Sequence, residues 1–163
     1  MKLSILICTT IERTEMFTLL YNECQNQIGR FGHSREIEII YIKDNKEISV
    51  GRKRQLLLEM SKAEWICYFD DDDFPYPYYI EEVWKAINQP NTDCVGINIS
   101  MTTNGGNPQR CCHSLKYPVW EEKKDGWDYV RNITHFNPIL RSKALMVGFS
   151  DKRFGEDKEY SVI

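Results

Sequence analysis

Hydrophobic and polar positions along the chain fall into short blocks that predict alternating strands and helices. Three short, nearly continuous apolar runs are typical of strands covered on both faces: Lys2–Cys8, Glu36–Ile42 and Trp65–Phe69. Cys94–Ile99 is expected to form a fourth strand.

Segments whose apolar residues have helical spacing lie between or after these runs. Apolar residues recur every three or four positions in Glu15–Ile28 and in Ile80–Ile87, and Arg52–Met60 is a third expected helix. The order predicts an α/β fold with a single Rossmann-like, open and mostly parallel sheet flanked by helices. Residues 100–135 show no clear period, with Gly and Asn clustered in Thr102–Pro108, and are expected to form a loop-rich excursion.

Length and charge narrow the possible partners. The 163 residues suit one domain, and 21 Lys and Arg against 24 Asp and Glu give a formal net charge of -3. No basic field exists to hold a nucleic acid, so none is expected as a partner.

The apolar run Leu3–Cys8 is too short for a membrane span or a secretion signal, and a cytoplasmic location is expected. The six cysteines lack CxxC spacing and are expected to be buried thiols rather than bridges or zinc ligands.

Polar residues follow each of the first three predicted strands. Thr9 and Arg13 come after the first strand, Asp44 after the second, and four consecutive aspartates, residues 70–73, after the third. Ligands of open α/β sheets bind at these carboxyl ends. The first strand lacks a Gly-rich loop, which argues against a dinucleotide site and a P-loop.

The four carboxylates repel one another, so this run is either a site for a divalent cation or a solvated acidic turn with Asp73 capping a helix. In an extended backbone, Asp70 and Asp72 would share one face. An EF-hand is excluded because Phe74 and Pro75 stand where an oxygen ligand and a glycine belong.

The expected helix before this acidic strand begins with cations, in Gly51–Arg54. Alone, this is either an anion site or a solvated basic turn. Cations and carboxylates on one side of a sheet together point to a metal-bridged phosphate, and hence to a nucleotide diphosphate.

These motifs resemble the nucleotide-sugar-binding domain of inverting glycosyltransferase family two, which has the GT-A fold. The similarity covers nearly the whole chain in the expected order. It rests on Ser4–Arg13, Gly51–Gln55, Ala63–Asp73, Asn137–Arg141, Gly148–Phe149 and Phe154–Asp157, which resemble the opening strand and turn, the basic helix, the DxD strand and the segment ending in the ED motif.

The resemblance implies a role for each matching residue. Thr9 and Asp44 would meet the nucleotide base, Arg54 the base or diphosphate, and Asp71 the ribose. Arg13 would join them in binding the donor, a UDP-, GDP- or dTDP-sugar. Asp72, supported by Asp70, would hold Mn²⁺ or Mg²⁺.

Asp157 would be the general base, removing a proton from a saccharide or other hydroxyl acceptor that attacks the anomeric carbon with inversion. His135 is either a contact to the acceptor or a phosphate, or a packed structural residue. Family members usually continue beyond this point, so residues 1–163 are expected to form one domain lacking part of the acceptor region.

Two other classes remain open. A nucleotidyltransferase would also use a metal and paired aspartates, but would be expected to carry a Gly-rich basic loop after the first strand. A non-catalytic module that binds a nucleotide sugar or a divalent ion would bind without turnover.

Overall fold

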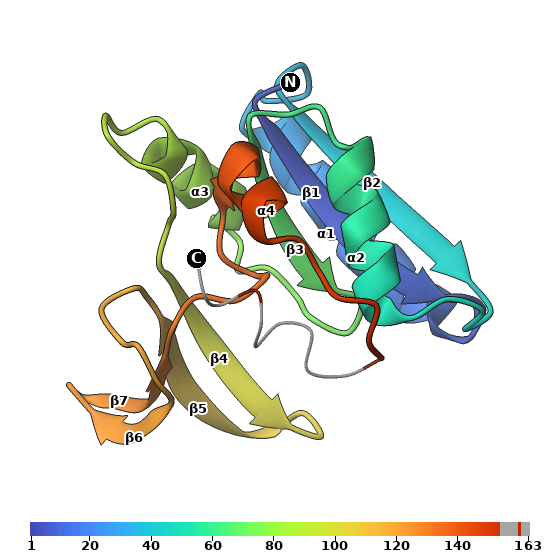
Figure 1. Cartoon of the computed structure of the whole chain (residues 1–163). Helices are drawn as coiled ribbons and strands as arrows, with labels where there is room; N and C mark the ends of the chain where they lie inside the picture. Colours follow the sequence, from blue (N-terminus) through green and yellow to red (C-terminus); the bar gives the residue numbers. More distant parts are fainter. Residues whose placement is uncertain (154–159, 161–163) are drawn as a thin grey trace.

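The computed structural model describes residues 1–153 and residue 160 (Figure 1). Strands and helices alternate through the first half of the chain, and most of the remaining strands follow one another in the second half. In order, the elements are β1 (Leu3–Thr10), η1 (Ile11–Arg13), α1 (Thr14–Arg30), β2 (Ile37–Asp44), α2 (Val50–Met60), β3 (Trp65–Asp70), α3 (Tyr79–Ile87), β4 (Ile97–Thr103), β5 (Gly106–His113), β6 (Glu121–Lys124), β7 (Trp127–Arg131), β8 (Ile139–Leu140) and α4 (Arg141–Val147).

The first three expected strands and all three expected helices are confirmed. The three strands lie together in the first sheet. Its strand order is β2-β1-β3-β8, with β1 parallel to both of its neighbours. The register pairs Thr10 of β1 with Asp44 of β2, and Cys8 of β1 with Asp70 of β3. The carboxyl ends of β1, β2 and β3 therefore meet at one edge of the sheet.

Alternating side chains of β1 fill two separate cores. Leu3, Ile5 and Ile7 pack with buried residues of α1 and α3, whereas Leu6 packs on the opposite face with residues of α2 and α4. This two-sided burial explains why the strands read as nearly continuous apolar runs. All six cysteines are free thiols, as expected, but only Cys24, Cys67 and Cys111 are buried, whereas the other three are partly exposed.

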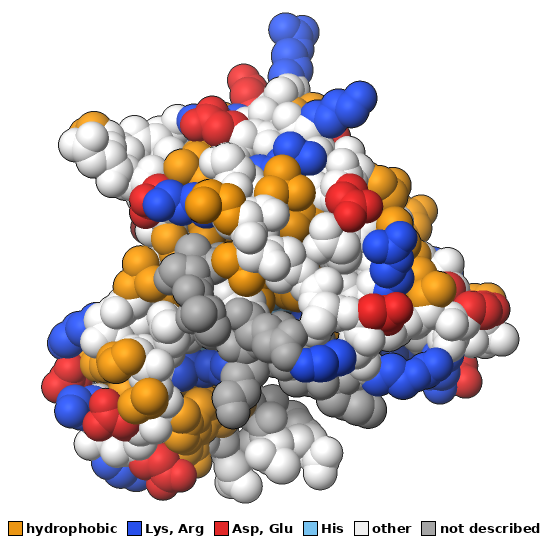
Figure 2. Space-filling view, in the orientation of Figure 1, with side chains coloured by type: hydrophobic (Ala, Val, Ile, Leu, Met, Phe, Trp, Pro, Cys, Tyr) orange, Lys and Arg blue, Asp and Glu red, His pale blue; other side chains and the backbone are white. Residues whose placement is uncertain are grey.

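The expectation of a single, mostly parallel sheet was wrong. A second four-stranded sheet has the order β4-β5-β7-β6, with β5 parallel to β7 and the other neighbours antiparallel. Figure 2 shows this part as a lobe below the α/β body, with hydrophobic and charged side chains on its visible surface.

Two further predictions from the sequence, for the fourth strand and for residues 100–135, were wrong. The fourth strand begins at Ile97 and belongs to the second sheet, while the fourth place in the first sheet goes to β8, antiparallel to β3. Residues 100–135 hold strands, not mainly loops. Their two hairpins turn at Asn104–Gly105 and Asp125–Gly126, where every φ is positive. These pairs are typical signals of two-residue hairpins.

Gly51 lets the chain after α4 pack closely on the first turn of α2. Its N–H donates to the carbonyl of Lys152, and a Cβ at this position would lie 2.0 Å from the carbonyl oxygen of Ser150. The side chain of Ser49, the N-cap of α2, also bonds Asp151. A glycine is therefore required where this helix begins.

Replacing Gly51 with alanine is expected to destabilise the fold by about 1 to 3 kcal/mol, because the new methyl group overlaps backbone that cannot swing away. Gly29→Ala is the matched control. Gly29 is also helical, nothing lies within 4 Å of its added Cβ, and alanine favours a helix. Chemical denaturation of both variants measures the difference. Equal stability of the two variants would contradict the close contact.

Candidate functional site

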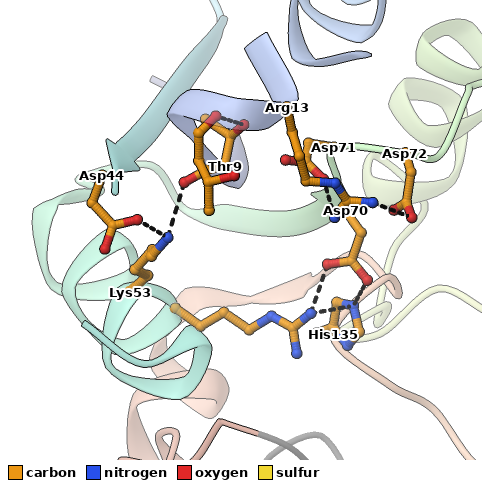
Figure 3. Close-up of polar contacts among 10 residues, drawn as sticks. Thr9, Arg13, Asp44, Lys53, Asp70, Asp71, Asp72 and His135 are labelled. Carbon is orange, nitrogen blue, oxygen red and sulfur yellow. Dashed lines mark hydrogen bonds and ion pairs between the residues drawn. The ribbon is translucent and has the colours of Figure 1, made fainter. Parts of the chain in front are cut away.

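Acidic side chains gather at the carboxyl edge of the first sheet, and each of four is paired with a cation from another element (Figure 3). Asp44 closes β2 and Asp70 closes β3, and Asp71 and Asp72 form the turn that follows. The cations are Arg13, which ends η1, and Lys53 and Arg54, which are neighbours in α2.

Arg13 holds two carboxylates at once. Its Nη1 lies 2.7 Å from Oδ1 of Asp71, and its Nη2 lies 2.6 Å from Oδ2 of Asp72. Asp71 is buried, whereas the Asp72 side chain is 52% exposed. Asp72 is therefore the carboxylate of this pair that a metal ion can reach from solvent.

The expected alternation of the aspartates along an extended strand was wrong. The strand ends at Asp70, and the backbone N–H of Asp73 donates to the carbonyl of Asp70 at 3.0 Å, closing a turn. Asp71 and Asp72 therefore both reach Arg13, while Asp70 reaches Arg54.

Arg54, Asp70 and His135 form a second, more buried group. Nη2 of Arg54 lies 2.7 Å from Oδ1 of Asp70 and 2.9 Å from Nε2 of His135. Nε2 of His135 also lies 3.4 Å from Oδ2 of Asp70. Burial by itself would raise the pKa of Asp70, but the hydrogen bond and charge of His135 and the charge of Arg54 hold it well below its usual range.

His135 reaches this group from the segment that links β7 to β8. Asn137 fixes that segment, since its side chain donates to the carbonyls of Val95 and His113 at 2.9 and 3.2 Å. Its side-chain oxygen also accepts from the N–H of Thr134 at 2.9 Å. The second sheet is thus tied to the edge of the first through a histidine whose place the sequence left open.

Lys53 and Asp44 form a third group beside the first strand. The ammonium group of Lys53 bonds Oδ1 of Asp44 and donates to the carbonyl of Thr9 at 2.9 Å. Oδ2 of Asp44 accepts from the N–H of Ile48 at 3.1 Å. Partial burial acts to raise the pKa of Asp44, and the hydrogen bonds of Lys53 and Ile48 outweigh it and lower that pKa.

The pKa values of two carboxylates in the acidic turn, Asp71 and Asp73, are raised. Burial raises the pKa of Asp71, although Thr9 and Arg13 oppose it. The Asp73 residue is exposed overall, yet partial desolvation of its carboxyl group and the charges of Asp70 and Asp72 raise its pKa to about 7. Asp73 has no ion-pair partner within the described residues, so the turn keeps uncompensated negative charge.

The structure therefore brings together Thr9, Arg13, Asp44, Arg54, Asp70, Asp71 and Asp72, all named from the sequence. Sequence reasoning missed Lys53 as an individual, because it treated the basic start of the helix as a group. Asp157 lies outside the described residues.

Most of the chain matches a known protein family. The model of the family described as Glycosyl transferase family 2 matches residues 22–146. The chain belongs to glycosyl transferase family 2. The matched range contains Asp44, Arg54 and the aspartate run, while Thr9 and Arg13 precede it and Asp157 follows it. A search of curated protein sequences finds no match.

Solved structures show the same fold for this family 2 domain. The crystal structure of S. aureus TarS 1-349 has a TM-score of 0.63 and 16% identity, covering 99% of this chain and 54% of that one. TarS 1-349 in complex with UDP-GlcNAc has a TM-score of 0.62 and 14% identity, covering 99% and 52%. The GT-A expectation is confirmed as a fold, and the chain spans about half the length of these structures.

No helix in residues 1–153 is long and apolar enough to cross a membrane.

The pairing of Arg54 with Asp70 is expected to couple their mutations. In a double-mutant cycle of Arg54→Met and Asp70→Asn, the coupling free energy should be about 1 to 2 kcal/mol, because a half-buried carboxylate loses its nearest cation. The exposed pair of Lys143 and Asp93, at 2.7 Å, is the control and should give about 0 to 1 kcal/mol. Urea denaturation measures both cycles, and equal couplings would contradict the buried group.

Proposed function

We propose that this chain is the donor-binding domain of a metal-dependent, inverting glycosyltransferase, which moves a sugar from a nucleotide-diphosphate donor to an acceptor hydroxyl. The observation that carries the proposal is the edge where β1, β2 and β3 end, since carboxylates and cations there match the groups of a metal-bound diphosphate. Family membership supports glycosyl transfer over transfer of a nucleotidyl group.

The paired groups divide the donor among them. Asp44, beside Thr9, would accept N–H groups of the base, and Asp71 would accept a ribose hydroxyl. Arg54 and Arg13 would neutralise the diphosphate. Thr9 would meet the base beside Asp44, and its backbone carbonyl also accepts a hydrogen bond from Lys53.

UDP is the nucleotide to test first among UDP, GDP and dTDP. TarS, which shares the fold, has been crystallised with UDP-GlcNAc and with UDP. Asp44 is an acceptor-only carboxylate, which suits the N3–H of uracil and repels the N3 lone pair of cytosine.

The residues present fit a metal that is shared with the donor. Within the part of the chain that the structure describes, no three His, Cys, Asp or Glu side chains are grouped to hold an ion by themselves. Mg²⁺ and similar ions at phosphate sites commonly use one or two carboxylates and complete their shell with phosphate oxygens and water. Exposed Asp72, with Asp70 in support, meets that requirement. A bound ion would supply Lewis-acid stabilisation of the departing diphosphate.

Asp157 is proposed as the general base. Its carboxylate would take the proton of the acceptor hydroxyl as that oxygen attacks the anomeric carbon opposite the nucleotide. The segment leading toward it, residues 148–153, is anchored on α2 at Gly51 and Ser49, next to Lys53 and Arg54. Residues 1–163 are proposed as one nucleotide-sugar-binding domain.

Asp72→Asn is expected to weaken Mn²⁺-dependent UDP binding at least about tenfold while the fold survives, because an exposed ion pair adds little stability. Isothermal titration with UDP, with and without Mn²⁺, measures the effect. Asp93→Asn is the matched control, since Asp93 is a similarly exposed carboxylate paired with one lysine. Unchanged metal dependence in folded Asp72→Asn would refute the assignment.

Asp157→Asn is expected to lower sugar transfer by about 10²- to 10⁴-fold and to leave UDP and Mn²⁺ affinity nearly unchanged, because a general base acts on the acceptor. The assay follows transfer from a matched UDP-sugar, using the longest natural chain. Wild-type transfer by the variant would place the base elsewhere. Donor binding without any transfer or hydrolysis by the unmutated chain would favour a binding module.

A further inference from the structure

Lys53 is a buried cation that neither the sequence motif nor the proposed chemistry uses. Its side chain is only 3% exposed, although it lies in the first half of a helix at the surface of the sheet. Burying an ammonium group is costly unless it is paired and hydrogen-bonded. Lys53 meets that condition through two acceptors, Asp44 and the carbonyl of Thr9.

These two acceptors lie on neighbouring strands at the donor-binding edge. Thr9 is next to the last residue of β1, and Asp44 is the last residue of β2, one register step further along. One ammonium group therefore joins the ends of both strands. A helix residue thus sets the position of a strand-end carboxylate.

Asp44 is held through both of its oxygens. Lys53 bonds Oδ1, and the N–H of Ile48 donates to Oδ2 at 3.1 Å, so the carboxylate plane cannot rotate freely. A carboxylate offers about four lone-pair positions, and the backbone N–H of Lys46 also interacts with Asp44, so these partners occupy most of them. The remaining positions are fixed in direction, and the Asp44 side chain keeps 12% of its surface exposed.

We propose that Lys53 is a positioning residue for base selection: it holds the Asp44 carboxylate in the orientation that accepts the N3–H of a uracil base. The ammonium group of Lys53 already bonds Asp44 and the carbonyl of Thr9, so Lys53 acts on the base through Asp44. This inference rests on the proposed function, because it assumes that the nucleotide binds at this edge.

Discrimination between uracil and cytosine follows from hydrogen-bond chemistry. Uracil presents N3–H, a donor, to the fixed carboxylate, whereas cytosine presents an unprotonated N3, an acceptor. A buried acceptor facing another acceptor loses a hydrogen bond and gains repulsion. A carboxylate that is free to turn away, or to take up a proton, would reject cytosine less strongly.

The test compares the affinities for UDP and CDP, measured by titration with Mn²⁺ present, in the wild type and in Lys53→Met. The wild type should prefer UDP, and Lys53→Met should reduce the ratio of the two affinities about tenfold. Lys53→Arg restores the cation and should recover much of the preference. Lys62→Met, which removes an exposed lysine just beyond α2, should leave the ratio unchanged.

A purely structural role would lower affinity for UDP and CDP alike and leave their ratio intact, which would overturn the inference. Asp44→Asn covers the case in which Lys53→Met does not fold: it should reduce the ratio by itself, and Lys53→Arg should have no further effect on the ratio in that background. An unchanged ratio in Asp44→Asn would also overturn it. If the wild type binds neither nucleotide, the proposed function fails, and this inference fails with it.

Discussion

The structure depends on the neutralisation of carboxylates where three parallel strands end together. Asp44, Asp70 and Asp71 lose much of their hydration at this edge, and burying a charge is unfavourable unless an opposite charge is close. The cations come from a short 3-10 helix and from the helix α2, and His135, in the segment after β7, adds a contact to Asp70. Correct folding therefore requires all of these elements to meet at one place, which is also the place where a charged donor would bind.

Helix α2 has the central part in this arrangement. Two consecutive residues, Lys53 and Arg54, point to carboxylates on opposite sides of β1, which lies between β2 and β3 in the sheet. At the start of the same helix, Gly51 leaves room for the backbone of Ser150 and Lys152 to pack against the first turn. The same turn thus places two cations and anchors the chain that leads toward Asp157.

The sequence predicts the α/β half well because burial on both faces of a strand leaves an unbroken apolar run. It predicts the second sheet poorly because strands such as Glu121–Lys124 are mostly polar and exposed, so no apolar pattern marks them. The Asn104–Gly105 and Asp125–Gly126 pairs were the available signal. At the site, the aspartates and Arg54 stand out by motif, whereas a single lysine in a basic helix looks the same whether it faces water or a carboxylate. His135 depends on a contact between distant segments, which local patterns do not record.

A crystal structure of the chain with UDP and Mn²⁺ would test directly whether the charge-paired edge of β1, β2 and β3 is the donor site. If it is, the uracil lies against Asp44, the diphosphate lies near Arg13 and Arg54, and Asp72 leaves Arg13 to bind the metal. A nucleotide bound away from that edge, with the ion pairs of Arg13, Lys53 and Arg54 unchanged, would contradict this assignment.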